Sequence, residues 1–375
     1  MSALFSNVSQ LNWQQVVMWC IGGLLIYLAI RKDMEPTLLL PLGFGAILVN
    51  LPMSGAVTQV YDGIAEIGVI DVLFDAGIAN ELFPLLLFVG IGAMIDFEPL
   101  LTNPKLMIFG AAAQFGIFFT LSLAALFGFD LKDAASIAII GAAHGPTSIF
   151  VANYFHSKYI GAIMVAAYSY MALVPVVQPP VIKLLTTKQE RRIRMVYQQR
   201  SVSKITKILF PIAITVITGI VSPRSVALIG FLMFGNLIRE CGVLDSLSET
   251  AQKVLANLVT LFLGITIATK MQAQYFLTAE TLLILGLGLV AFVFDTAGGV
   301  IFAKILNLFL PKDSKINPMI GAAGISAFPM SVRVVHKLGR AEDPQNFLLM
   351  PAVGVNVSGQ IASVIAGGLI LNLLG

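Results

Sequence analysis

Long apolar segments follow one another along almost the whole chain, and no other feature restricts its fold as strongly. The first, "VVMWCIGGLLIYLAI", covers residues 16–30, and further segments continue as far as residue 374. A helix needs about 20 mostly apolar residues to cross the hydrocarbon core of a bilayer, and many of these segments approach that length. The sequence therefore predicts an all-α polytopic membrane protein.

The composition leaves little material for a separate water-soluble domain. Of the 375 residues, 57% are hydrophobic and 11% are charged, whereas soluble domains carry about 25% charged residues. We expect a single membrane domain over residues 1–375. The net charge of +3 does not indicate a nucleic-acid partner, because Lys and Arg in loops also set membrane orientation.

The distribution of Lys and Arg predicts how the chain is oriented. The most basic loop is "KLLTTKQERRIRMVYQQRSVSKITK", which starts at Lys183, and cytoplasmic loops carry an excess of these residues. Arg31 and Lys32, at the end of the first segment, are expected on the same side. The N-terminus is therefore expected outside.

Two apolar segments contain residues that interrupt a helix. A Gly-Pro pair in "GAAHGPTSIF" interrupts the segment 134–155, and Gly324 and Pro329 interrupt the segment 316–335. Broken backbone is tolerated at membrane depth only where it is buried in protein or lines a cavity. The first five apolar segments after the anchor cannot all cross, because the chain must return to the cytoplasm. We expect 134–155 to re-enter from outside and 316–335 to re-enter from the cytoplasm.

The order of the segments predicts two repeats of inverted topology, with about ten crossings in all. The expected parts are an anchor helix in 1–34, a first repeat in 35–185, a basic loop and linking helix in 186–222, and a second repeat in 223–375. The broken segments take corresponding positions in the two repeats. This organisation is typical of secondary transporters, whose site lies where the two breaks meet.

Carbonyl, hydroxyl and amide oxygens that converge at such breaks suit a hard cation such as Na⁺. Thr147 and Ser148 are candidate ligands at the first break. The second break and the last span offer Asn317, Gly321, Gly324, Ser326, Asn356, Ser358 and Gln360.

Two charged residues stand out near these breaks. Asp295 lies deep in the apolar segment 280–309, where a charge costs roughly 2.5–3.5 kcal/mol. It is either a functional group or a hydrogen-bonded structural one. Arg333 follows the second break by about one turn, and its guanidinium can hold a carboxylate through two hydrogen bonds. The alternative for Arg333 is a snorkelling anchor.

Two tyrosines precede a proline-rich stretch in "AAYSYMALVPVVQPP". They are Tyr168 and Tyr170, and Pro175, Pro179 and Pro180 are expected to break the same span. A buried phenol can relay a proton or ligate through its oxygen. More commonly it is a packed ring whose hydroxyl has a partner.

Several of these stretches carry a family resemblance that extends over the chain from about residue 35 onward. They closely resemble the β subunit of the sodium-pumping biotin-dependent decarboxylases, which include oxaloacetate, methylmalonyl-CoA, glutaconyl-CoA and malonate decarboxylases. The stretches are "GIGAMIDFEPLLTNPK", "AAQFGIF", "GPTSIF", "SYMALVPVVQPPVIKLLTTK", "NLIRECGV", "FDTAGGVIFAK" and "NPMIGAAGISAFPMSVR".

The resemblance implies a carboxybiotin decarboxylase in a bacterial cytoplasmic (inner) membrane. A carboxyltransferase subunit would pass CO₂ from an acid to biotin on a carrier subunit, and this chain would then release the CO₂, consume a proton and export Na⁺. It also implies a small single-span membrane subunit and a homo-oligomer. The family's catalytic residues fall on Tyr170, Arg333 and His144, with Arg333 at the biotin. Its ion-site residues fall on His144, Asn317, Gly321, Ser326 and Asn356.

His144 departs from the family pattern, which has an aspartate in a DGPT motif. A neutral imidazole offers a cation one nitrogen and no negative charge, and a protonated one repels it. Three interpretations are open. The replacement, natural or engineered, abolishes pumping; or protons carried by His144 replace Na⁺; or Asp295 supplies the missing charge.

A second functional class fits the same topology. A secondary transporter of an organic anion, without decarboxylation, could also use inverted repeats and Arg333. Such a carrier would work alone, whereas a pump subunit needs a biotinylated partner.

Overall fold

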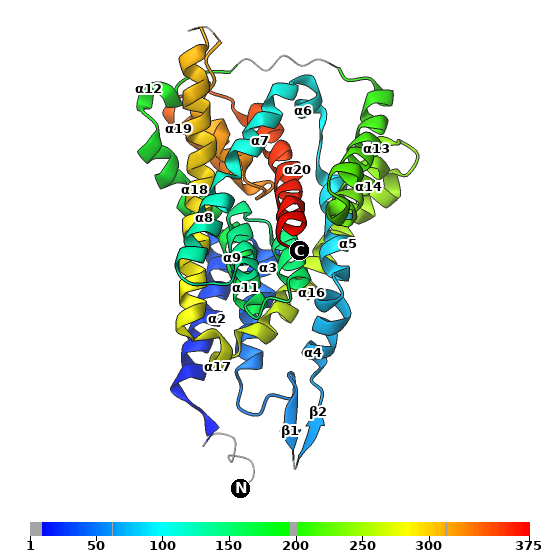
Figure 1. Ribbon diagram of the computed structural model, residues 1–375, viewed down its shortest axis with the longest axis vertical. Coiled ribbons are helices and arrows are strands. Elements are labelled where there is room, and N and C mark those ends of the chain that lie inside the picture. Colours follow the sequence, from blue (N-terminus) through cyan, green and yellow to red (C-terminus); the bar gives the residue numbers. More distant parts are fainter. Residues whose placement is uncertain (1–9, 62, 196–200, 312–313) are drawn as a thin grey trace.

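The computed structural model describes residues 10–61, 63–195, 201–311 and 314–375. Its helices form an elongated bundle, with one short β-hairpin at the end where the N-terminus lies (Figure 1). Among the described residues, seven helices are long and apolar enough to cross a membrane, or eight if the bent pair Val69–Ala79 and Leu82–Met94 is one span. The chain is an all-α polytopic membrane protein, as predicted. The number of about ten crossings stays a prediction.

The elements of the first half lead from the N-terminal helix to the end of the long helix α11. They are α2 (Trp13–Lys32), α3 (Pro36–Val49), β1 (Gln59–Tyr61), β2 (Ile64–Glu66), α4 (Val69–Phe74), η2 (Asp75–Ala79), α5 (Leu82–Met94), α6 (Glu98–Thr102), η3 (Pro104–Leu106), α7 (Met107–Ala113), α8 (Phe115–Leu126), α9 (Leu131–Ala138), η4 (Ile139–Ala142), α10 (Gly145–Tyr154) and α11 (Ile160–Leu185). The hairpin is antiparallel and pairs Gln59 with Glu66.

The elements of the second half begin in the basic loop and end at the C-terminal helix. They are α12 (Lys188–Arg191), α13 (Lys204–Val221), η5 (Pro223–Ser225), α14 (Val226–Glu240), α15 (Asp245–Glu249), η6 (Thr250–Leu255), α16 (Ala256–Ile267), η7 (Ala268–Met271), α17 (Ala273–Phe276), α18 (Ala279–Phe309), η9 (Pro318–Gly324), α19 (Met330–Glu342) and α20 (Leu349–Leu374).

Two helix pairs pack in related ways, α5 along α14 and α3 along α16. In the first pair, a Cβ added to Gly235 would lie 2.1 Å from the carbonyl oxygen of Val89, so only glycine permits this approach. Asn236 of α14 donates to the carbonyl of Ile95 at the end of α5, over 3.0 Å. In the second pair, Asn50 at the end of α3 donates to the carbonyl of Met271, over 2.8 Å.

Two long helices, α11 and α18, run without interruption. The three prolines of α11 were expected to break its span, but the helix runs without interruption from Ile160 to Leu185. Neighbouring helices can satisfy the carbonyls that a proline frees, so proline is tolerated inside membrane helices. The helix α18 also continues through Asp295 and the glycines that follow it.

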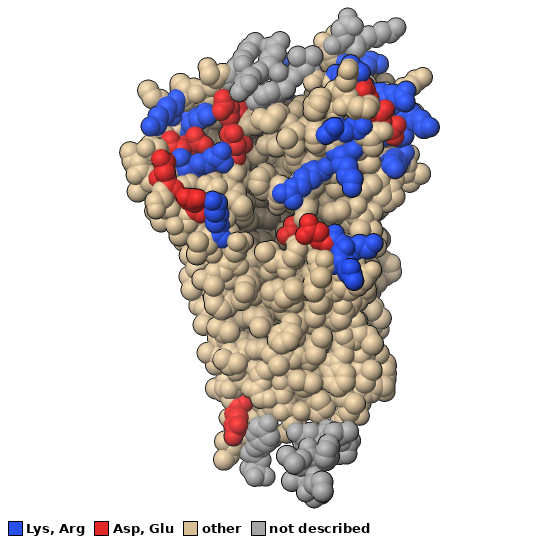
Figure 2. Space-filling view, turned by 180° about the vertical axis from the view of Figure 1, so that it is seen from behind, with Lys and Arg blue, Asp and Glu red and all other residues tan. Residues whose placement is uncertain are grey.

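Charged side chains gather toward one end of the molecule, above a band of uncharged surface, on the face that Figure 2 shows. Ion pairs at this end include Arg191 with Glu342, Arg194 with Asp343 and Lys207 with Glu98. The basic loop contributes to this end, although its residues 196–200 lie outside the described residues. Such a distribution is what a membrane protein with one strongly basic side would show.

Candidate functional site

Both interrupted segments are broken helices. In the first, the short helix η4 ends at Ala142, the next residue, Ala143, has a left-handed φ of 48°, and His144 precedes the new helix α10. Proline fits the first turn of α10, where its missing N–H leaves no carbonyl unpaired. In the second, η9 ends at Gly324 and α19 starts at Met330, so the non-helical residues 325–329 separate two helical pieces.

The two breaks lie against each other. The backbone N–H of Ser326, in the second break, donates to the carbonyl of Ala142, in the first, over 3.0 Å. The last helix, α20, packs against this contact. The hydroxyl oxygen of Ser326 lies 3.0 Å from the carbonyl oxygen of Gly359 and 2.5 Å from the hydroxyl oxygen of Ser363, and its single hydrogen serves these two contacts.

Three buried amide side chains satisfy the carbonyls that the second break frees. Asn356 donates to the carbonyls of Ala323 and Ile325 over 2.9 and 2.7 Å. Gln178 donates to the carbonyl of Ala322 over 2.7 Å, and Gln360 donates to that of Ser326. The amide oxygens of all three are buried and have no hydrogen-bond partner within the described ranges. They are therefore available as ligands.

The first break places an imidazole at the same junction. Nδ1 of His144 lies 2.7 Å from the hydroxyl of Thr147, and the hydroxyl of Ser148 donates to the carbonyl of His144 over 3.1 Å. The ring of Phe88 meets the imidazole edge-on, with centroids 5.0 Å apart. Nε2 of His144 is buried and unpaired among the described side chains and backbone.

A cavity of about 360 Å³ reaches both breaks. His144 and Ser326 line it at the junction, and Arg333 and Glu35 line it as well. Arg333 is exposed, and no ion pair holds its guanidinium within the described part of the chain. The other residues that line the cavity are Thr37, Leu87, Ile91, Met94, Pro146, Tyr168, Met171, Gln252, Ala256, Asn257, Thr260, Phe328, Pro329 and Gln360.

Glu35 shares the cavity with Arg333 and was not singled out in the sequence. It lies in the short connection between α2 and α3 and has a left-handed backbone, with φ of 38°. Burial raises the pKa of its carboxyl, and the guanidinium of Arg333 opposes this rise. The cavity therefore carries one acidic and one basic group, coupled electrostatically.

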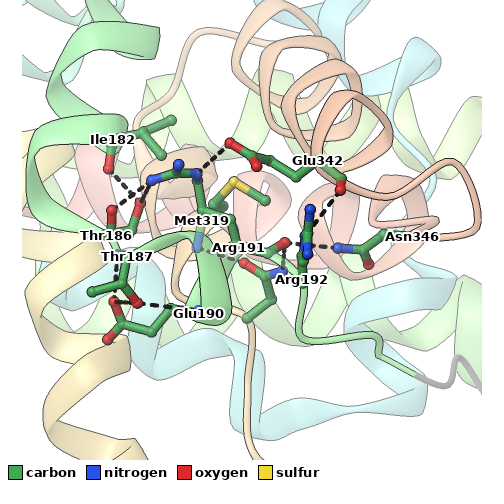
Figure 3. Close-up of polar contacts among 10 residues, drawn as sticks. Ile182, Thr186, Thr187, Glu190, Arg191, Arg192, Met319, Glu342 and Asn346 are labelled. Carbon is green, nitrogen blue, oxygen red and sulfur yellow. Dashed lines mark hydrogen bonds and ion pairs between the residues drawn. The ribbon is translucent and has the colours of Figure 1, made fainter.

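Asn317 was expected at the ion site, but its side chain makes hydrogen bonds to the basic loop. Its Nδ2 donates to the carbonyls of Arg191 and Ile193 over 2.9 and 2.8 Å, and its Oδ1 accepts from the N–H of Met319. Asn346 donates to the same carbonyl of Arg191, and the Arg191 guanidinium reaches Thr186 and Glu342 (Figure 3). Asn317 thus holds the basic loop against the start of η9 and does not line the cavity.

Gly321 serves close packing. A Cβ added to it would lie 2.0 Å from the carbonyl oxygen of Gly299, so η9 approaches α18 as only two glycines allow. Tyr170 is likewise turned away from the cavity, because its hydroxyl donates to the carbonyl of Leu285 in α18. The family's ion-site and catalytic positions are therefore not all gathered around one cavity.

Asp295 is fully buried beside the first break. Its Oδ1 accepts from the N–H of Ile117 over 3.1 Å, at the kink between α7 and α8. A Cβ added to Gly141 of η4 would lie 2.6 Å from its Oδ2, which has no partner in the described part of the molecule. A carboxyl group is thus packed against the broken helix that carries His144.

Comparison with known proteins agrees with this architecture. Residues 14–374 match the family model described as the Na⁺-transporting oxaloacetate decarboxylase beta subunit. The chain is 48% identical to glutaconyl-CoA decarboxylase subunit beta of Acidaminococcus fermentans, covering 97% of this chain and 94% of the relative. It is 46% identical to methylmalonyl-CoA decarboxylase subunit beta of Propionigenium modestum, covering 97% and 96%. It is 43% identical to oxaloacetate decarboxylase beta chain of Haemophilus ducreyi, covering 99% and 98%.

The chain belongs to this family of β subunits. It is therefore a membrane subunit of a Na⁺-transporting decarboxylase, and its resemblance to that family in sequence is confirmed. Family membership favours a decarboxylase over a carrier of organic anions that acts alone.

Two residues of this β subunit's cavity and second break were not chosen from the sequence, namely Glu35 and Gln178. A residue in a short connection next to two charges carries little signal, which explains why Glu35 was missed. The amide of Gln178 in the apolar helix α11 was a usable signal, because a buried amide in a membrane helix needs partners. Only the structure separates Tyr168, at the cavity, from Tyr170.

Proposed function

We propose that this β subunit decarboxylates carboxybiotin in the 360 Å³ cavity and couples the reaction to Na⁺ export. The observation that carries the proposal is that one cavity is lined by Arg333, whose guanidinium has no ion pair among the described residues, and reaches the junction of both broken helices. Biotin would be presented by a carrier subunit and loaded by a carboxyltransferase subunit. When bound, it supplies the N-carboxyl group whose C–N bond is cleaved.

The residues of the cavity fit an anionic ligand with a polar ring. Arg333 presents its guanidinium without a competing ion pair in the described chain, so it can bind a carboxylate through two N–H groups. Glu35 shares the cavity, where a neutral carboxyl would not compete for Arg333 but a charged one would. We propose that these two groups select and release the carboxylated ring.

The oxygen atoms at the junction support the cation part of the proposal. Within the described residues, no three His, Cys, Asp or Glu side chains form a metal cluster, so a transported cation must rely largely on neutral oxygens. The unpaired amide oxygens of Asn356 and Gln360 have the chemistry that Na⁺ prefers. Asp295, packed against Gly141 of the same broken helix, is our candidate for the negative charge that His144 lacks.

The remaining roles follow from position. Ser326 and Thr147 shape the junction through their hydrogen bonds, and Gly321 lets η9 pack on α18. We propose the two inverted repeats as the moving parts, and the matching Asn50 and Asn236 contacts support this. The bacterial inner membrane, an outer N-terminus, a small single-span subunit and a homo-oligomer belong to the same proposal.

The test uses the native complex in sealed vesicles. The complex is isolated through its biotin on monomeric avidin, reconstituted, and supplied in turn with glutaconyl-CoA, methylmalonyl-CoA or oxaloacetate. We expect one of these acids to drive both CO₂ release and ²²Na⁺ uptake into vesicles whose complexes face outward. The decarboxylase proposal fails if the chain does not co-purify with biotin, and the coupling fails if CO₂ is released without ²²Na⁺ uptake.

A further inference from the structure

One tyrosine of α11 is buried at the cavity, and its hydroxyl has no partner in the described ranges. The side chain of Tyr168 is 1% exposed and lines the cavity. Its hydroxyl oxygen makes no hydrogen bond to any described residue. A buried hydroxyl that the protein itself does not satisfy is costly, so such a group points to a ligand or water that completes it.

The hydroxyl end of this ring lies at the first break. A Cβ added to Gly145 would be 2.2 Å from Cζ of Tyr168, the ring atom that carries the hydroxyl. Any side chain at position 145 would displace the phenol. The absence of a side chain at Gly145 therefore leaves the space in which the phenol of Tyr168 packs against the broken helix.

Two other residues that line the same cavity carry a buried polar atom with no partner among the described residues. They are His144, through Nε2 at the start of α10, and Gln360, through Oε1 on α20. Together with the hydroxyl of Tyr168 they come from three different elements. A phenol that can donate and an amide oxygen that can accept suit a ligand with a carbonyl oxygen next to an N–H group. The ureido group of biotin has this pattern.

We propose that Tyr168 donates a hydrogen bond to the ureido oxygen of the biotin ring, and that it is a catalytic residue of the decarboxylation. This inference rests on the proposed function. The bond between the ureido nitrogen and the carboxyl carbon breaks, CO₂ leaves, and the electron pair stays on the ureido group. The nitrogen then takes a proton from water, which leaves hydroxide. Tyr168 stabilises the negative charge that develops on the ureido oxygen, as donors in an oxyanion hole do.

Tyr170 provides the matched comparison, two residues further along α11. Its hydroxyl already donates to the carbonyl of Leu285, and it does not line the cavity. Removing the hydroxyl of Tyr168 takes away no hydrogen bond within the described protein, whereas removing that of Tyr170 does. Tyr168→Phe should therefore unfold at the same temperature as the wild type or higher, and Tyr170→Phe at a lower temperature.

The experiment measures ligand binding and turnover separately. The full chain and both variants are purified in detergent, and their unfolding temperatures are recorded with increasing biocytin, which carries the biotin ring on a lysine. The same variants are assembled into the avidin-purified complex, and ¹⁴CO₂ release is followed from the carrier after one cycle of carboxylation.

We expect biocytin to raise the unfolding temperature of the wild type and of Tyr170→Phe, but not of Tyr168→Phe. We also expect Tyr168→Phe to slow ¹⁴CO₂ release by about 100-fold or more, the loss typical for one oxyanion donor. The inference is overturned if Tyr168→Phe keeps the biocytin shift or releases CO₂ within threefold of the wild-type rate. It is overturned as well if the wild type shows no shift. A wild-type complex that binds biocytin but releases no CO₂ would instead refute the proposed function.

Discussion

Asn356 offers the sharpest test of how the second break is held. Its Nδ2, which carries two hydrogens, lies 2.9 and 2.7 Å from the carbonyl oxygens of Ala323 and Ile325 and 2.9 Å from the hydroxyl of Ser331. The side chain is fully buried, so water cannot replace these bonds. In Asn356→Ala at least two backbone carbonyls lose this donor.

The expected cost follows from the two carbonyls. Each buried acceptor left without a donor costs about 1–3 kcal/mol, so the variant should lose about 2–6 kcal/mol of unfolding free energy. For a chain of this size about 1 kcal/mol corresponds to roughly 2 °C, which gives a fall of about 4–12 °C in unfolding temperature. The assay is thermal unfolding of the detergent-purified chain followed by far-UV circular dichroism.

Asn372 is the control on the same helix. Among the described residues its side chain makes one hydrogen bond, of 3.3 Å, to the hydroxyl of Ser222, and the residue is exposed. Asn372→Ala should lower the unfolding temperature by no more than about 2 °C, since one exposed hydrogen bond contributes about 1 kcal/mol or less. If the two variants unfold at the same temperature, the amide of Asn356 does not hold the break.

Three further predictions follow from the charged groups. Arg333→Gln should raise the KM for the carboxylated carrier about 10- to 100-fold, because a hydrogen bond to a charged group contributes about 1.5–3 kcal/mol. Lys337 lies outside the cavity, so Lys337→Gln should change this KM less than threefold, and equal effects of the two substitutions would refute the binding role of Arg333. Burial raises the pKa of Glu35, so the folded state binds this proton more tightly than the unfolded state, and the free energy of unfolding falls as the pH rises through the folded-state pKa. Glu35→Gln should remove this part of the pH dependence of unfolding. An unchanged pH profile in the variant would contradict the prediction. Arg191→Ala should lower the free energy of unfolding by about 3 kcal/mol in a chemical unfolding titration, because it leaves the carboxylate of Glu342, 2.7 Å away, without its buried partner. A decrease below about 1 kcal/mol would show that this ion pair behaves as a weak surface pair.

The helix breaks could be predicted because their cause is local. Gly and Pro next to polar residues interrupt a helix wherever they stand in such a run, and both breaks are present at His144 and around Pro329. The three prolines of α11 show the limit of the same rule. Whether a proline ends a helix depends on neighbours that satisfy its freed carbonyl, and those neighbours are distant in sequence.

The candidate site was only partly predictable for a related reason. Residues two positions apart on a helix, such as Tyr168 and Tyr170, face different directions, and the sequence does not say which direction holds the cavity. Asn317 is another case, because its partners Arg191 and Ile193 lie more than 120 residues earlier in the chain. Arg333 could be singled out as a charge one turn after a break in an apolar segment, but the sequence left a snorkelling anchor open, and the structure places Arg333 at the cavity.

The contact between the two broken helices is the centre of this account, and a cross-link tests it most directly. In a variant that lacks Cys20 and Cys241, cysteines replace Ala142 and Ser326. The carbonyl oxygen of Ala142 and the backbone nitrogen of Ser326 lie 3.0 Å apart. We expect mild oxidation in proteoliposomes to form an intramolecular disulfide, seen by peptide mass spectrometry, and to stop CO₂ release until a reductant is added. Failure of this pair to cross-link in folded protein, or full activity of the cross-linked form, would contradict a site built where the two breaks meet.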